Sequence, residues 1–236
     1  MRLLLLSNST DHGRGYLEHA RDEVVDVLGG VDELLFAPYA LADHDAYTAR
    51  VAAAVEPLGV RLRPLHREAD PQAAVRDARA LFVGGGNTFR LLRTLQRSDL
   101  LDTVRTAVRS GLVYLGASAG TGISAPTIRT TNDMPIVEPE GFAALDLVPF
   151  QINPHYVDAD PTSRHMGETR ELRLQEYLEE NDVPVLGLRE GTWLRVDGER
   201  AEVGGTAVAP SAPGPALVIR RGQPPTEVAG DVRALF

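Results

Sequence analysis

The stretch Leu112-Val113-Tyr114-Leu115-Gly116-Ala117-Ser118-Ala119-Gly120 decides the fold expected for this chain. Its apolar part, residues 112–115, predicts a short buried strand. The next five residues have the form G-x-S-x-G, which is typical of a nucleophile elbow, a sharp strand-to-helix turn that exposes one hydroxyl at the edge of a sheet. Glycines suit this turn because a Cβ beside the serine would collide with neighbouring backbone. We therefore expect Ser118 to be a nucleophile; the alternative is a glycine-rich turn that merely contains a serine.

Strands and helices alternate on the N-terminal side of this stretch. Strands are expected over 2–6, 32–37, 60–65 and 80–83, and helices over 16–28, 43–56, 71–77 and 99–109, with a further helix after Asn87. Such alternation predicts βαβ units and a parallel sheet with right-handed crossovers.

The pattern changes after residue 146. Residues 151–156 are expected to form a loop and residues 168–180 a charged helix. Short apolar segments at 184–188, 192–196, 201–203 and 216–219 are separated by turn residues, so we expect antiparallel strands that finish one edge of the sheet. The prediction is one α/β catalytic domain over residues 1–236, with three layers, a mostly parallel sheet, helices on both faces, a nucleophile elbow and short C-terminal antiparallel strands.

Composition limits the possible functions. The 236 residues are 43% hydrophobic and carry a net charge of −9, which disfavours nucleic-acid binding because that activity needs basic patches. The absence of cysteine excludes disulfides and thiolate chemistry. The apolar run 3–6 is too short for a signal peptide, and no segment is long enough to cross a membrane, so a cytoplasmic enzyme is expected. No metal-ligand spacing is present, and we expect neither a metal nor an organic cofactor.

A serine nucleophile needs a base and a group that orients the base. Of the six histidines, His155 is the candidate base because it follows an apolar segment, where loops at strand ends gather active sites. A surface position in a loop is the alternative. Acid candidates are Asp133, Glu138, Glu140 and Glu168. For Asp133 the alternative is a turn carboxylate that caps its own backbone.

The glycine run 84–86 ends the apolar strand at 80–83. It lacks both the G-K-[ST] of a phosphate-binding loop and the G-x-G-x-x-G spacing of a dinucleotide fold. Beside an elbow, such a strand end can supply a backbone N–H to an oxyanion hole. The alternative is that these glycines only form a tight turn into the following helix.

Five ordered blocks of this sequence resemble the peptidase E family of aspartyl dipeptidases, which are serine hydrolases on a class I glutamine-amidotransferase-like fold. The blocks are 83–89, 116–120, 126–136, 151–155 and 167–170. The resemblance implies that Ser118 is the nucleophile, His155 the base and Asp133 the group that orients it. It also implies an oxyanion hole formed by the backbone N–H groups of Gly86 and Ala119.

The same resemblance implies hydrolysis of dipeptides with an N-terminal L-aspartate (Asp-X) and a possible homodimer. Arg170 is the first candidate for binding the aspartyl side chain, because a guanidinium grips a carboxylate with two hydrogen bonds; the alternative is a solvated ion pair with Glu168 or Glu171. Arg129 is the second candidate. Glu168 is a candidate partner for the substrate amine, and Asn87 is a further substrate-binding candidate.

Two other functions are compatible with the sequence. One is a cyanophycinase-like hydrolase of β-aspartyl peptides, and the other is an inactive binding module of the same fold. Intact Ser118, Asp133 and His155 argue against the second.

Overall fold

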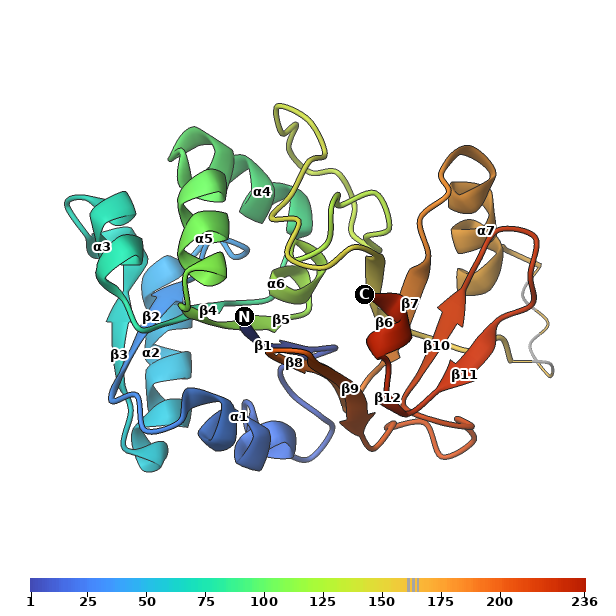
Figure 1. The fold of residues 1–236 in the computed structure, drawn as a ribbon, viewed down its shortest axis with the longest axis horizontal. Helices are drawn as coiled ribbons and strands as arrows, with labels where there is room; N and C mark the ends of the chain where they lie inside the picture. The colour runs from blue at the N-terminus through green and yellow to red at the C-terminus, as the bar shows by residue number, and fades with distance from the viewer. Residues whose placement is uncertain (161, 163, 165) are drawn as a thin grey trace.

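The computed structural model describes residues 1–160, 162, 164 and 166–236. Its larger sheet has the strand order β12-β9-β8-β1-β5-β4-β2-β3 (Figure 1). The strands from β1 to β3 in this order are parallel, whereas β8, β9 and β12 extend the β1 edge as antiparallel neighbours. In chain order the strands are β1 Arg2–Leu6, β2 Glu33–Ala37, β3 Arg61–Pro64, β4 Ala80–Val83, β5 Val113–Ala117, β8 Thr192–Asp197, β9 Arg200–Gly205 and β12 Gly230–Asp231.

Helices cover both faces of this sheet, as the sequence predicts (Figure 1). In β1, Leu3 and Leu5 pack into the layer with α3, α4 and α5, whereas Leu4 and Leu6 pack into the layer with α1 and α2. This division follows from the alternation of side chains along a strand. The helices are α1 Arg21–Leu28, α2 His44–Val55, α3 Pro71–Asp77, α4 Thr88–Arg97, α5 Leu100–Arg109, α6 Ala119–Gly122 and α7 Arg170–Glu180. Single turns of 3₁₀ helix cover Glu18–Ala20, Glu56–Leu58, Leu65–Arg67 and Arg233–Leu235.

A second, smaller sheet has the order β11-β10-β7-β6. Its strands are β6 Gln151–Tyr156, β7 Val185–Arg189, β10 Ala216–Ile219 and β11 Thr226–Val228. Leu174 and Leu178 of α7 pack on it in a separate apolar cluster. The sequence prediction that all the late strands finish one sheet edge is therefore wrong in part. The segments at 192–196 and 201–203 extend the larger sheet, but those at 184–188 and 216–219 build the smaller one.

The expected loop at residues 151–156 is in fact strand β6, which pairs in parallel with β7. The prediction failed because this strand is polar yet buried. Gln151 donates a hydrogen bond to Thr127 Oγ1 and Asn153 Nδ2 donates one to the Thr130 carbonyl, so the amide donors of both buried side chains are paired inside the protein. A polar segment can form a buried strand when its side chains find such partners.

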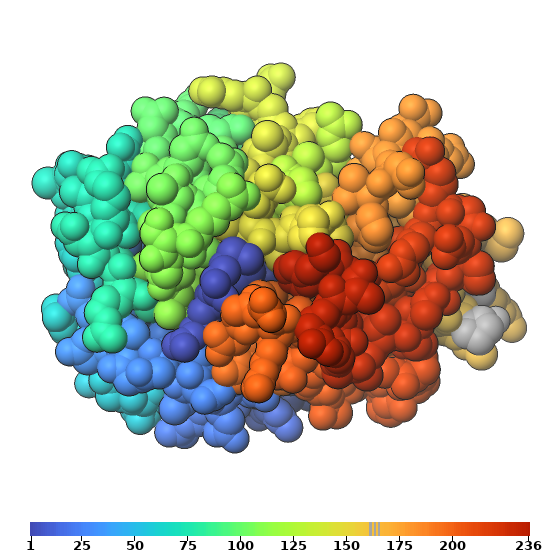
Figure 2. All heavy atoms as spheres, in the orientation of Figure 1, coloured from blue at the N-terminus to red at the C-terminus, as the bar shows by residue number. Residues whose placement is uncertain are grey.

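The long segment 126–150 (yellow) lies between α4 and α5 on one side and α7 on the other in the space-filling view (Figure 2). Among the described residues, no helix combines the length and apolar character needed to cross a lipid bilayer. The assignment of residues 1–236 to one catalytic domain stays a prediction.

Candidate active site

Ser118 lies on the predicted elbow, between the end of β5 and the start of α6. Its φ of 53° and ψ of −110° are unusual for a residue with a side chain. Glycine is required in this turn for the predicted reason: a Cβ at Gly116 would lie only 2.6 Å from the carbonyl oxygen of Gly120. This strained turn aims the Ser118 hydroxyl away from the larger sheet and towards His155 on the smaller sheet.

His155 is brought to Ser118 by β6. Its Nε2 lies 2.9 Å from Ser118 Oγ, so the structure brings together the two residues predicted to act as base and nucleophile. His155 has a φ of 54°, and the pairing of β6 with β7 shifts register between Asn153 and Tyr156. β6 is an edge strand of its sheet, which is where a bulge and Pro154 are tolerated. The bulge re-aims the imidazole towards the larger sheet.

The carboxylate beside His155 is Glu190, which follows the last residue of β7. Its Oε1 lies 2.6 Å from His155 Nδ1, and the two side chains are 47% and 37% exposed. The structure therefore does not bring Asp133 to His155, the pairing that the family resemblance implies. The sequence did not single out Glu190, although one signal was available: it lies two residues after the predicted strand at 184–188, at the same sheet edge as His155.

Asp133 instead belongs to the N-terminus of α4. Its Oδ2 accepts hydrogen bonds from the Thr88 backbone N–H at 2.7 Å and from Thr88 Oγ1 at 2.6 Å. A carboxylate is favourable there because helix N-termini carry unpaired N–H groups and a partial positive charge. Asn87, a predicted substrate contact, caps the same helix by accepting from the Arg90 N–H, and its Nδ2 donates to the Met134 carbonyl. Both residues hold the segment around Met134 against α4.

The glycine run after β4 passes directly beside Ser118. A Cβ on Gly85 would lie 3.0 Å from the Ser118 Cβ. Gly86 has a φ of 137°, and a Cβ there would lie 2.6 Å from the Ala40 carbonyl oxygen. Within the described ranges, the N–H groups of Gly86 and Ala119 have no hydrogen-bond partner. They are thus available as the predicted oxyanion donors.

Arg170 begins α7 and reaches towards β6. Its Nη1 donates to Asn132 Oδ1, and Asn132 Nδ2 donates to the Pro154 carbonyl at 2.8 Å, next to His155. No carboxylate pairs with Arg170 in the part of the chain that the structure describes, and its Nε is buried without a partner. Burial, followed by the charge of Arg173, lowers the pKa of the Arg170 guanidinium. An unpaired, half-buried guanidinium close to the base is suited to bind a carboxylate.

The other predicted substrate contacts are occupied elsewhere. Glu168 forms an exposed ion pair with Arg173 at 3.4 Å. Arg129 is exposed and lies 5.4 Å from the centre of the Phe142 ring. Of the four candidates, only Arg170 combines partial burial with a free charge.

Arg189 anchors the strand that carries Glu190. Its side chain is buried, and its five N–H donor positions are used by both oxygens of Asp158, both oxygens of Glu227 and the Gly214 carbonyl. A buried guanidinium needs such complete pairing, because an unpaired charge in the interior is costly. This network fixes the end of β7 immediately before the catalytic candidate.

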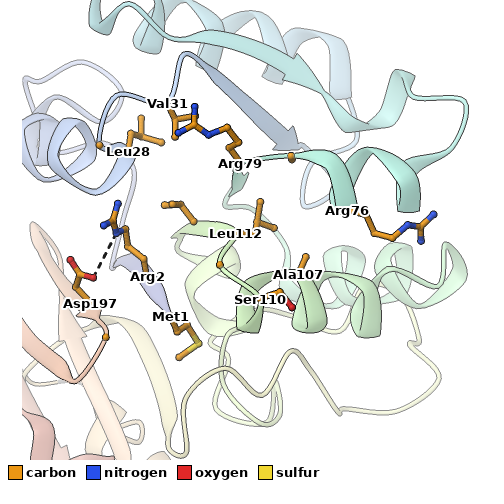
Figure 3. A pocket seen from close by; sticks show the side chains of 15 residues that line it. Met1, Arg2, Leu28, Val31, Arg76, Arg79, Ala107, Ser110, Leu112 and Asp197 are labelled. Carbon is orange, nitrogen blue, oxygen red and sulfur yellow. Dashed lines mark ion pairs between the residues drawn. The ribbon is translucent and has the colours of Figure 1, made fainter.

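A cavity of about 610 Å³ lies at the amino-terminal ends of β1 and β5, in the middle of the larger sheet (Figure 3). Arg2, Arg76 and Arg79 line it, and Arg2 pairs with Asp197. Arg76 lies in the last turn of α3, where a basic side chain stabilises the partial negative charge of the helix end. The cavity is separate from Ser118, which lies at the other ends of the parallel strands.

Comparison with known proteins identifies the family of the chain. The model of peptidase family S51 matches residues 3–204, which include Ser118, His155 and Glu190. The chain belongs to peptidase family S51. It is 60% identical to a protein named peptidase E from Streptomyces coelicolor, over 97% of this chain and 91% of that one. It is 54% identical to a probable alpha-aspartyl dipeptidase from Drosophila melanogaster, over 84% of each chain.

A solved structure of the same fold is a putative peptidase E protein from Listeria monocytogenes. It matches with a TM-score of 0.66 at 21% identity, over 87% of this chain and 98% of that one. This likeness supports the α/β architecture. The resemblance noted in the sequence is therefore confirmed at the level of the family and the fold.

Proposed function

We propose that this S51 family member is a serine-type dipeptidase that hydrolyses Asp-X dipeptides through an acyl-enzyme on Ser118. The observation that carries the proposal is the unbroken contact chain from Ser118 Oγ to His155 Nε2 and from His155 Nδ1 to Glu190. The names of the relatives supply the substrate class, because they include peptidase E and alpha-aspartyl dipeptidase.

Acylation uses the three side chains in turn. Ser118 Oγ attacks the peptide carbonyl carbon while His155 Nε2 takes its proton, and the Glu190 carboxylate stabilises the imidazolium. The N–H groups of Gly86 and Ala119 stabilise the oxyanion of the tetrahedral intermediate. His155 then passes the proton to the leaving amine as the C–N bond breaks, which frees the second amino acid.

Deacylation repeats these steps with water. His155 takes a proton from the water as its oxygen attacks the acyl carbon, and it returns the proton to Ser118 Oγ as the ester bond breaks. The free aspartate is then released. The balance of atoms requires water only, with no oxidant or second substrate.

Arg170 is proposed as the residue that binds the aspartyl side chain. Its support is the half-buried charge without a carboxylate partner in the described ranges and its link through Asn132 to the strand of His155. In an acidic protein, an acidic substrate needs such a local positive charge. The other candidates are weaker: Glu168 is paired with Arg173, Arg129 is exposed beside Phe142, and Asn87 is uncharged and hydrogen-bonded to Met134.

A dipeptide panel tests this function. Purified protein is incubated with Asp-Leu, Asn-Leu, Glu-Leu, Ala-Leu and β-Asp-Arg, and the released amino acids are measured. We expect hydrolysis of Asp-Leu, abolished in Ser118→Ala. Preferential cleavage of β-Asp-Arg would favour the cyanophycinase-like alternative. Absence of both turnover and labelling of Ser118 by a serine-directed acylating reagent would favour an inactive binding module.

A cytoplasmic location and a homodimeric state complete the proposal. Both derive from the sequence and the family resemblance. Cell fractionation tests the first, and sedimentation equilibrium of the purified chain tests the second.

A further inference from the structure

The three catalytic candidates come from two different sheets. Ser118 follows β5 of the larger sheet, whereas His155 and Glu190 belong to β6 and β7 of the smaller one. The relative position of the sheets therefore sets the distance between the nucleophile and its base. One buried segment, residues 6–8 at the end of β1, forms hydrogen bonds with the backbone around all three candidates.

The first residue of this segment, Leu6, is hydrogen-bonded to the backbone of Ser118. The Leu6 carbonyl accepts a hydrogen bond from the Ser118 backbone N–H at 3.1 Å and another from Thr121 Oγ1 in α6. These two bonds attach the end of β1 to the elbow itself. The next residue is thus held at a fixed position relative to Ser118.

Ser7 carries the connection to the base. Its Oγ accepts from the His155 backbone N–H at 2.9 Å and donates to the Leu188 carbonyl in β7 at 2.9 Å. Its own N–H donates to the Thr192 carbonyl. Ser7 is fully buried, so water cannot take over these bonds. His155 has the left-handed backbone that a side chain disfavours, and such strain persists only when surrounding contacts hold it.

Asn8 makes the corresponding contact with the acid. Its Oδ1 accepts from the Gly191 N–H at 2.8 Å, directly after Glu190. Asn8 is 4% exposed. The amide thereby fixes the turn from which the Glu190 side chain projects.

We propose that Ser7 and Asn8 are positioning residues that align His155 and Glu190 with Ser118 across the two sheets. Their hydrogen bonds reach the backbone of His155, Leu188 and Gly191, so they act through the backbone at the catalytic candidates. This inference rests on the proposed function, since it assumes that Ser118 and His155 react as a pair. It gives a role to Ser7 and Asn8, the polar residues that follow β1 and take no direct part in the proposed mechanism.

The test is Ser7→Ala with Ser124→Ala as its matched control. Ser124 is also a fully buried serine, but its hydroxyl donates to the nearby Thr121 carbonyl and has no contact with His155 or Glu190. Because misplacement of a catalytic group by about 1 Å costs about 100-fold, we expect Ser7→Ala to lower kcat about 10- to 100-fold. KM should change little, and Ser124→Ala should retain the wild-type kcat. Ser7→Thr, which keeps the hydroxyl, should recover part of the loss.

A second readout separates this inference from the substrate proposal. The rate of Ser118 labelling by a serine-directed acylating reagent depends on its base but not on recognition of aspartate. We expect Ser7→Ala to slow labelling and to displace its pH profile, even if Asp-Leu is not the substrate. A wild-type labelling rate and pH profile in folded Ser7→Ala would overturn the inference. If that variant does not fold, Asn8→Ala replaces it, with the same expected and contradicting results.

Discussion

Replacement of Glu190 by glutamine is the sharpest test of the site, because it separates the acid seen in the structure from the one expected from the sequence. Glu190 Oε1 lies 2.6 Å from His155 Nδ1. Glutamine keeps the shape and can still accept that hydrogen bond, so the variant removes mainly the negative charge. That charge matters when His155 becomes positive during attack by Ser118.

The expected loss follows from Coulomb's law. Two unit charges about 4 Å apart interact by about 1 kcal/mol in water and about 4 kcal/mol near a protein surface. Since the side chains are 37% and 47% exposed, solvent screens the pair and the lower part of that range applies. A loss of about 1 to 2 kcal/mol corresponds to a fall in kcat of about 5- to 30-fold. KM should stay near its wild-type value, because the charge stabilises the transition state more than bound substrate.

The assay is steady-state hydrolysis of Asp-Leu at neutral pH, normalised to active sites by titration with an acylating reagent. Asp133→Asn is the matched comparison, since it also exchanges one carboxylate for an amide, but at the N-terminus of α4 beside Thr88. We expect a smaller fall in kcat for Asp133→Asn than for Glu190→Gln, accompanied by a lower Tm. The reasoning is refuted if Asp133→Asn loses more kcat than Glu190→Gln without a change in Tm.

Two further predictions concern specificity and stability. Arg170→Ala should lower kcat/KM for Asp-Leu at least about tenfold, or about 1.4 kcal/mol, while Arg129→Ala should not; an unchanged value in Arg170→Ala would transfer the role to Arg129. Burial raises the pKa of Tyr39 to about 12 and that of Tyr114 further, so the folded state retains these protons more strongly than the unfolded chain. The resulting stability is complete below about pH 10 and is lost as the pH rises towards the folded pKa values. Tm should therefore fall between pH 10 and 12, less steeply in Tyr114→Phe; equal slopes would contradict this account.

The carboxylate beside His155 illustrates what local sequence cannot decide. In the sequence, Asp133 and Glu190 both look like ordinary polar residues, and each lies in a turn-rich segment. Their roles depend on which positive or N–H partner the fold brings near: the free N-terminus of α4 for Asp133, and the His155 ring for Glu190. The strand β6 was missed for a related reason, because Gln151 and Asn153 are polar but find buried partners only in the folded chain.

By itself, the sequence determined the elements whose causes are local. The glycines around Ser118 specify the strained turn, since any larger residue would collide with neighbouring backbone. The uninterrupted apolar run of β1, together with the apolar positions of the helices, predicts a sheet covered on both faces. Only the tertiary structure decided that His155 and Glu190 come from a second sheet and that Ser7 links this sheet to the elbow. These contacts join residues more than 30 positions apart in the chain, so the packing of the two sheets brings them together rather than any local sequence pattern.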